Sequence, residues 1–140
     1  MPTTREYSVR MEDQPGTLGK ICRALADHEV NILAFQSVPF EGKSLVRFTV
    51  DNPTTTKSVL DSQKLAYTET EVVQAKFPNR PGELARATLQ LGEANINIDY
   101  AYCGIDPGSS APLLIFGVAD ADLAAKILDK AAATVATAGA

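Results

Sequence analysis

The sequence Asp13-Gln14-Pro15-Gly16-Thr17-Leu18 returns 66 residues later as Asn79-Arg80-Pro81-Gly82-Glu83-Leu84. The alignment continues without a gap, and six positions between residues 13 and 32 are identical at this offset. These are Pro15/Pro81, Gly16/Gly82, Leu18/Leu84, Leu25/Leu91, Asn31/Asn97 and Ile32/Ile98. Similarity at one fixed offset is typical of a chain built from repeated units. We therefore predict two copies of one unit, at residues 5–70 and 71–140.

Composition limits the classes of protein that this chain can be. The 140 residues suit one medium domain or two small ones, and 45% hydrophobic with 21% charged residues is typical of a folded globular protein. The net charge of −4 disfavours nucleic acid as a partner. The longest apolar run, Ala111 to Ala119, is too short to cross a membrane. Because the N-terminus shows no apolar signal segment, we expect a cytoplasmic protein that does not associate with membranes.

The first copy has the pattern of a small α+β unit. Alternating Tyr7, Val9 and Met11 predict a strand. Apolar residues at helical spacing between Leu18 and Ala26 predict a helix of about three turns. The pattern then predicts a hairpin of residues 30–38 and 45–50 about a Glu41-Gly42 turn. A turn and helix start at residues 51–54, a short helix at 57–64 and a strand at 65–70 follow.

The second copy repeats this order. It predicts a strand at 72–77, a helix at 83–93, strands at 96–103 and 112–118, and a helix from Ala121 to about Ala133. Residues 134–138 suit either a short edge strand or a tail. The expected fold is α+β, with two ferredoxin-like βαββαβ units whose antiparallel sheets are covered by helices. Because almost no turn residue separates 65–70 from 72–77, we expect the units to pack as a rigid pair.

The sequence offers little catalytic chemistry. It contains no recognisable nucleophile motif, phosphate-binding loop or metal-ligand spacing, so we predict no catalytic residue, no metal and no cofactor. The one histidine, His28, is expected to be a solvated residue near the end of the first helix. Cys22 and Cys103 stand alone and are expected to be buried free thiols.

The two Pro-Gly loops have a more specific physical use. Each leads into a helix whose first N–H groups have no partner within the helix, and such donors can receive a small carboxylate. Asp13 and Asn79 precede the loops, and Asn31 and Asn97 open the strands that follow. The alternative is structural: Asp13 and Asn79 are ordinary helix caps, and Asn31 and Asn97 are turn residues.

The pattern Asp/Asn-x-Pro-Gly-x-Leu, then an amphipathic helix, then Asn-Ile resembles the ACT domain, a regulatory module of amino-acid metabolism. The resemblance extends from Tyr7 to about Ala133, as in a stand-alone tandem ACT protein. It implies that a free amino acid binds where two ACT units meet, between the loop of one and the second strand of the other. The implied ligand-binding residues are Asp13, Gln14, Pro15, Gly16 and Asn31 in the first copy, and Asn79, Arg80, Pro81, Gly82 and Asn97 in the second.

The loops differ in chemistry. The Asn-Arg-Pro-Gly sequence of the second loop resembles that of serine-sensing members, whereas acidic Asp13 suits a ligand's ammonium group rather than its carboxylate. Arg80 is either a carboxylate clamp or a solvated loop charge.

Two functions follow from this interpretation. One is a sensor in which a bound amino acid changes contact with a partner enzyme or regulator. The other is a protein-interaction module or regulatory subunit with degenerate ligand sites. In both cases we expect a homo-oligomer, most simply a dimer.

Overall fold

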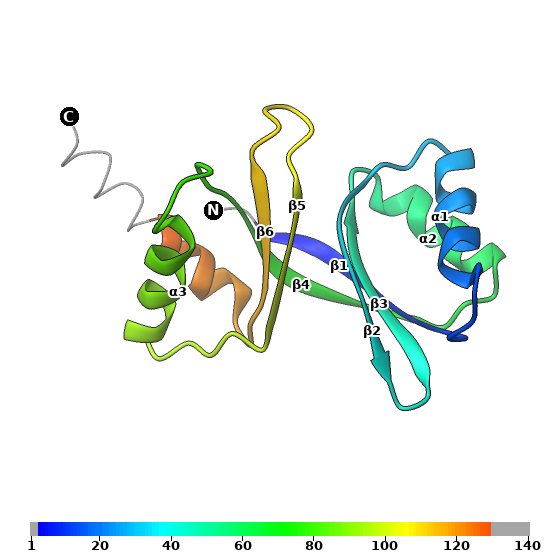
Figure 1. The fold of residues 1–140 in the computed structure, drawn as a ribbon, viewed down its shortest axis with the longest axis horizontal. Helices are drawn as coiled ribbons and strands as arrows, with labels where there is room; N and C mark the ends of the chain where they lie inside the picture. The colour runs from blue at the N-terminus through cyan, green and yellow to red at the C-terminus, as the bar shows by residue number, and fades with distance from the viewer. Residues whose placement is uncertain (1–2, 130–140) are drawn as a thin grey trace. The chain divides into compact units, whose positions relative to one another are not determined.

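The structure is a computed structural model of the chain, and it describes residues 3–129. The chain divides into two compact units (Figure 1). One contains residues 5–70, and the other contains Thr3, Thr4 and the residues from Glu71 onward. Both units have the mixed α+β, ferredoxin-type arrangement that the sequence predicts.

The first unit follows the order strand, helix, strand, strand, helix, strand. Its elements are β1 (Thr3–Met11), α1 (Thr17–Asp27), β2 (Ile32–Phe40), β3 (Lys43–Val50), α2 (Pro53–Ser62) and the start of β4 (Tyr67–Lys76). Both β1 and β2 pair antiparallel with β3, which therefore lies between them. Helices α1 and α2 cover one face of this sheet (Figure 1).

The core of the first unit lies between that sheet face and the two helices. Tyr7, Val9 and Met11 alternate along β1 and are buried, and they pack in one cluster with Leu25 of α1 and Leu60 of α2. The ring of Tyr7 lies 5.8 Å from that of Phe48, centroid to centroid. The Tyr7 hydroxyl donates a 3.1 Å hydrogen bond to the carbonyl oxygen of Pro53, so this buried polar group is satisfied.

The second unit repeats the order strand, helix, strand, strand, helix over its described residues. It consists of β4 from Glu71 onward, α3 (Glu83–Glu93), β5 (Tyr100–Ile105), β6 (Pro112–Gly117) and a helix at residues 121–129. Both β4 and β5 pair antiparallel with β6. The core cluster of this unit includes Val73, Leu91, Phe116 and Leu128, so it lies between strands β4 and β6 and the two helices.

Two predicted strand boundaries are wrong, whereas the predicted start of the second helix is confirmed. The strands predicted at 65–70 and 72–77 are one continuous strand, β4. Strand β5 begins at Tyr100 rather than at 96, because its register pairs Tyr100 with Gly117, the last residue of β6. Helix α2 starts at Pro53, within the turn and helix start predicted at residues 51–54. Asn52 Oδ1 accepts the Thr55 N–H there at 3.1 Å, and proline is tolerated in the first turn.

The remaining predictions for these elements hold. The first strand, helix α1 and the hairpin of the first copy are confirmed, and Glu41 and Gly42 form its turn with φ of 51° and 80°. Two positive φ values suit a two-residue hairpin turn, because such a turn matches the twist of the strands. The possible strand at 134–138 and the end of the last helix lie outside the described residues.

Candidate functional site

The Pro-Gly loops of both copies have the same backbone. Gly16 has φ 89° and ψ −14°, and Gly82 has φ 89° and ψ −12°. These angles, with proline one residue earlier, are those of a type II turn, whose third position needs a positive φ. The closing bond runs from the Thr17 N–H to the Gln14 carbonyl oxygen at 3.2 Å, and from the Glu83 N–H to the Arg80 carbonyl oxygen at 3.5 Å. Proline and glycine are therefore required by the turn itself.

Replacing Gly16 with alanine is expected to destabilise the protein by about 1–2 kcal/mol, because the left-handed conformation is costly for a residue with a Cβ. No atom lies within 4 Å of a Cβ built at Gly16, so this cost is conformational. Gly19, inside α1, also has open space around it and serves as the matched control. Gly19→Ala is expected to stabilise by up to about 1 kcal/mol. Urea unfolding measures both, and equal effects of the two substitutions would contradict the argument.

The first turn of each helix keeps free donors. The first bond within α1 runs from the Lys20 N–H to the Gly16 carbonyl oxygen at 3.0 Å, and that of α3 from the Arg86 N–H to the Gly82 carbonyl oxygen at 2.9 Å. Neither helix has a side-chain cap. Within residues 3–129, nothing accepts a hydrogen bond from the N–H groups of Leu18, Gly19, Leu84 or Ala85.

The alternative in which Asp13 and Asn79 cap the helices is therefore wrong. The N-cap positions belong to Gly16 and Gly82. Asp13 instead accepts a 3.2 Å hydrogen bond at Oδ1 from the Ser44 hydroxyl on β3. Its carboxylate thus lies beside the loop and leaves the helix donors free.

The loop and the strand-opening asparagine of one copy lie at opposite ends of its sheet. Met11, two residues before Asp13, pairs with Ser44, whereas Ile32, which follows Asn31, pairs with Val50. Six residues of β3 separate those ends, or about 20 Å at 3.3 Å per residue. The Asn31 backbone N–H donates to Asp51 Oδ1 at 2.9 Å. Within one unit, Asn31 therefore does not reach the Asp13 to Gly16 loop.

The second copy has the same layout. The Phe77 N–H, two residues before Asn79, donates to the Pro112 carbonyl oxygen, and the Asp99 N–H donates to that of Gly117 at the other end of β6. Asn97 Nδ2 donates to Asp99 Oδ1 at 2.9 Å. Asn97 thus lies far from the Asn79 loop of its own unit.

A buried carboxylate distinguishes the second loop. The Glu83 side chain, in the first turn of α3, is only 7% exposed. Its Oε1 accepts from Arg80 Nε at 2.6 Å and from an Arg86 guanidinium nitrogen at 3.3 Å. The Arg80 side chain is 63% exposed and is paired with Glu83 at the start of the helix that follows its loop. This cluster was not predicted from the sequence, although the spacing of residues 80, 83 and 86 along a helix start could have indicated it.

The two arginines change the acidity of Glu83. The hydrogen bond from Arg80 holds the pKa of the Glu83 carboxyl below its usual value, and the charges of both arginines act in the same direction. Since the folded-state pKa is lowered, ionised Glu83 stabilises the fold above its unfolded-state pKa of about 4.3. This stabilisation is lost as the pH falls through the lower folded-state value.

Glu83→Gln is therefore expected to destabilise the protein at pH 7, with a difference from the unsubstituted protein that shrinks as the pH falls from about 5 toward 2. Thermal unfolding across this range measures the difference. Glu93→Gln, at the exposed end of the same helix, is the control and should show no such trend. A pH-independent effect of Glu83→Gln would mean that its charge is not what matters.

The remaining candidates are placed as follows. His28 is exposed at the C-terminal end of α1, as predicted, with Nδ1 2.9 Å from the Ala24 carbonyl oxygen. Both cysteines are free, but Cys103 is exposed and Cys22 half-buried, so the prediction of buried thiols is wrong. Burial raises the pKa of the Cys22 thiol. Side chains along β5 alternate between half-buried and exposed, and Cys103 is at one of the exposed positions.

Over residues 3–129, no three metal-ligating His, Cys, Asp or Glu side chains come together. Helices in the same range are all too short or too polar to cross a bilayer.

Comparison with known families gives a direct match. The family model described as ACT domain matches residues 8–64, which includes the first Pro-Gly loop, α1 and Asn31. Residues 8–64 are therefore similar to an ACT domain. No curated protein has a sequence that matches this chain.

Solved structures resemble nearly the whole chain. Protein BT0572 from Bacteroides thetaiotaomicron has a TM-score of 0.81 at 22% identity, covering 91% of this chain and 88% of that one. The ligand-free regulatory subunit of aspartate kinase from Thermus thermophilus has a TM-score of 0.61 at 16% identity, covering 91% of each chain. Aspartokinase III from E. coli, in complex with lysine and aspartate, has a TM-score of 0.53 at 16% identity, and the match covers 91% of this chain but 31% of that one. These likenesses show a shared fold, which extends beyond residues 8–64 to nearly the whole chain.

Proposed function

We propose that this protein is a non-catalytic regulatory protein that binds a free amino acid through its Pro-Gly loops and changes contact with a partner protein in response. The observation that carries the proposal is the free pair of N–H groups at the start of α1, behind a turn whose Pro-Gly sequence fixes its shape. Two adjacent donors at the positive end of a helix suit a carboxylate.

The first loop also supplies a group for the other end of an amino acid. The exposed Asp13 carboxylate accepts one hydrogen bond, from the Ser44 hydroxyl. Its remaining lone pairs can accept hydrogen bonds from an ammonium group. Donors for a carboxylate at the start of α1 and an acceptor for an ammonium group on the loop before it are therefore only a few residues apart. Asn31 and Asn97 lie too far from the loops of their own units, so in this proposal each contributes to a site formed with another copy of the ACT unit.

The regulatory part of the proposal rests on the ACT domain and on structural relatives that are regulatory subunits of aspartate kinase. A ligand that binds one arrangement of such units better than another shifts the population toward it. The same ligand would then favour or disfavour a partner enzyme or regulator. In a homodimer, the Pro-Gly loop of one chain could meet the strand-opening asparagine of the other chain.

Thermal unfolding of the protein against each of the twenty amino acids tests the proposal. A ligand that binds only the folded state adds about 2.7 kcal/mol when its concentration is about 100 times its Kd. We expect a clear shift with one or a few amino acids, reduced by Asp13→Ala or Asn31→Ala for a first-loop ligand and by Asn79→Ala or Asn97→Ala for a second-loop ligand. Ser58→Ala, on the exposed side of α2, is the control. No shift with any amino acid would refute the sensor.

A second function is favoured by one observation. In the second copy, Arg80 and Arg86 both form ion pairs with the Glu83 carboxylate. Their charges are therefore already paired within the protein, as expected for a degenerate ligand site. If no amino acid binds, the protein is better explained as an ACT-type interaction module or regulatory subunit. In that case, disrupting the loops should leave its association with a partner unchanged.

A further inference from the structure

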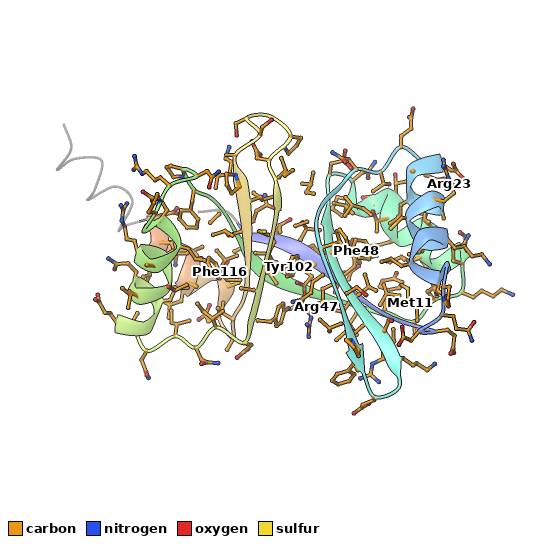
Figure 2. All side chains as sticks on the ribbon, viewed as in Figure 1. Met11, Arg23, Arg47, Phe48, Tyr102 and Phe116 are labelled. Carbon is orange, nitrogen blue, oxygen red and sulfur yellow. The ribbon has the colours of Figure 1, made fainter. Side chains whose placement is uncertain are left out.

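The first ACT unit contains a hollow whose lining includes no residue of the Pro-Gly loop. It has a volume of about 170 Å³ and lies against the start of α1, and we call it the α1 hollow. Its lining is Met11, Thr17, Lys20, Ile21, Gln63 and Leu65. All six residues belong to the unit of residues 5–70, so the hollow needs no second unit. Figure 2 labels Met11, which packs in the core cluster with Ile21 between the sheet and the helices.

The lining combines an apolar floor with one cation. Met11 is 4% exposed and Ile21 is 5% exposed, and Leu65 packs against the same core. Lys20 is exposed, and no carboxylate of residues 3–129 lies within ion-pair distance of its ammonium group. The hydroxyl of Thr17 and the amide of Gln63 add neutral polar groups. An unpaired cation beside an apolar surface suits an anion that carries an aliphatic body.

The second copy shows which anion fits this position. At the fixed offset of 66 residues, Thr17 corresponds to Glu83 and Lys20 corresponds to Arg86. In the second copy the Glu83 carboxylate is 93% buried and lies 3.3 Å from the Arg86 guanidinium. The chain thus places a carboxylate of its own next to the equivalent cation. In the first copy the cation remains, but the carboxylate is replaced by threonine and a hollow is present.

We infer that the α1 hollow binds a small aliphatic monocarboxylate, with its carboxylate beside Lys20 and its hydrocarbon body on Met11, Ile21 and Leu65. An apolar cavity of about 150 Å³ holds a six-carbon molecule such as benzene. The hollow therefore suits a body of about four to six carbons. No acidic side chain is among its lining residues, so nothing there balances an α-ammonium group. The ligand is thus a carboxylic acid without an amino group, which separates this hollow from the proposed amino-acid site.

The test is a titration of the full chain with hexanoate, followed by the NMR signals of the Met11, Ile21 and Leu65 methyl groups. We expect saturable shifts of these signals. In the Asp13→Ala variant, which lacks the proposed ammonium acceptor of the first loop, leucine at the same concentration should leave them in place. Hexanol, which has the same body without the charge, should also leave them in place. If hexanoate causes no shift, or if leucine shifts these methyls as strongly in Asp13→Ala, the inference is wrong.

Two variants test the role of the charge. Lys20→Met keeps the length of the side chain and should weaken hexanoate at least tenfold, whereas Arg23→Met, on the same helix but not lining the hollow, should not. Thr17→Glu reproduces the arrangement of the second copy, so its own carboxylate should occupy the hollow and abolish binding while the protein remains folded. Unchanged affinity in Lys20→Met or in folded Thr17→Glu would overturn the inference.

The outcome is independent of the proposed function. Amino-acid binding at the Pro-Gly loops, measured by thermal unfolding, would persist in Lys20→Met. Hexanoate binding at the α1 hollow would in turn persist in Asp13→Ala and Asn79→Ala.

Discussion

Replacing either Leu25 or Leu91 with alanine is expected to lower the free energy of unfolding by about 2–5 kcal/mol. The two residues occupy the same position in the two copies and are 1% and 0% exposed. Each lies in the core cluster of its own unit, Leu25 with Tyr7 and Leu91 with Phe116. Truncation removes buried hydrocarbon and leaves a cavity that the surrounding side chains fill only in part.

Urea unfolding of both variants measures the effect, and Leu89→Ala is the matched control. Leu89 lies on the same helix as Leu91 but is 65% exposed, so its replacement should change stability by no more than about 0.5 kcal/mol. A loss at Leu89 as large as that at Leu91 would contradict the described helix face. A small effect at Leu25 with a large one at Leu91 would mean that the two cores are not equivalent.

Gly117→Ala is expected to destabilise the second unit by about 1–3 kcal/mol, although glycine to alanine is usually tolerated in regular structure. Gly117 on β6 pairs directly with Tyr100 on β5. The ring of Tyr100 covers Gly117 and occupies the place where a Cβ would stand. An added methyl group therefore forces the tyrosine ring to move.

A double-mutant cycle isolates this contact. In a Tyr100→Ala background the obstruction is gone, so Gly117→Ala should cost much less than it does beside the tyrosine, and the coupling free energy should be about 1–3 kcal/mol. Gly92→Ala, at a helical glycine with open space around it, is the control and should not destabilise. If Gly117→Ala costs the same with and without Tyr100, the ring is not the cause.

The two loops illustrate how a duplicated backbone can carry different chemistry. Gly16 and Gly82 have nearly the same dihedral angles, since proline and glycine leave the turn little choice. The side chains that follow are free to differ, and Thr17 and Glu83 do so in charge. One helix start is therefore left open to an incoming anion, whereas the other carries an anion of its own.

The repeat, the α+β class and the order of elements over residues 3–129 follow from the amino-acid sequence alone. These depend on local patterns: alternation along β1, helical spacing along α1, and the Pro-Gly turns. The same local chemistry predicted the Glu41-Gly42 turn and the helix start at residues 51–54. It misplaced the start of β5, because that start depends on the register with β6, in which Tyr100 pairs with the last residue, Gly117.

The contacts of each candidate residue depend on the tertiary structure. Asp13 could have been a helix cap, but its carboxylate instead accepts a hydrogen bond from the hydroxyl of Ser44, 31 positions away. Asn31 belongs to the same sequence motif as the first Pro-Gly loop, but it lies at the opposite end of β3 from that loop. The burial of Glu83 and the α1 hollow beside Lys20 are also invisible in the sequence. Such features depend on which distant segments meet in space, and the pattern of neighbouring residues along the chain does not contain that information.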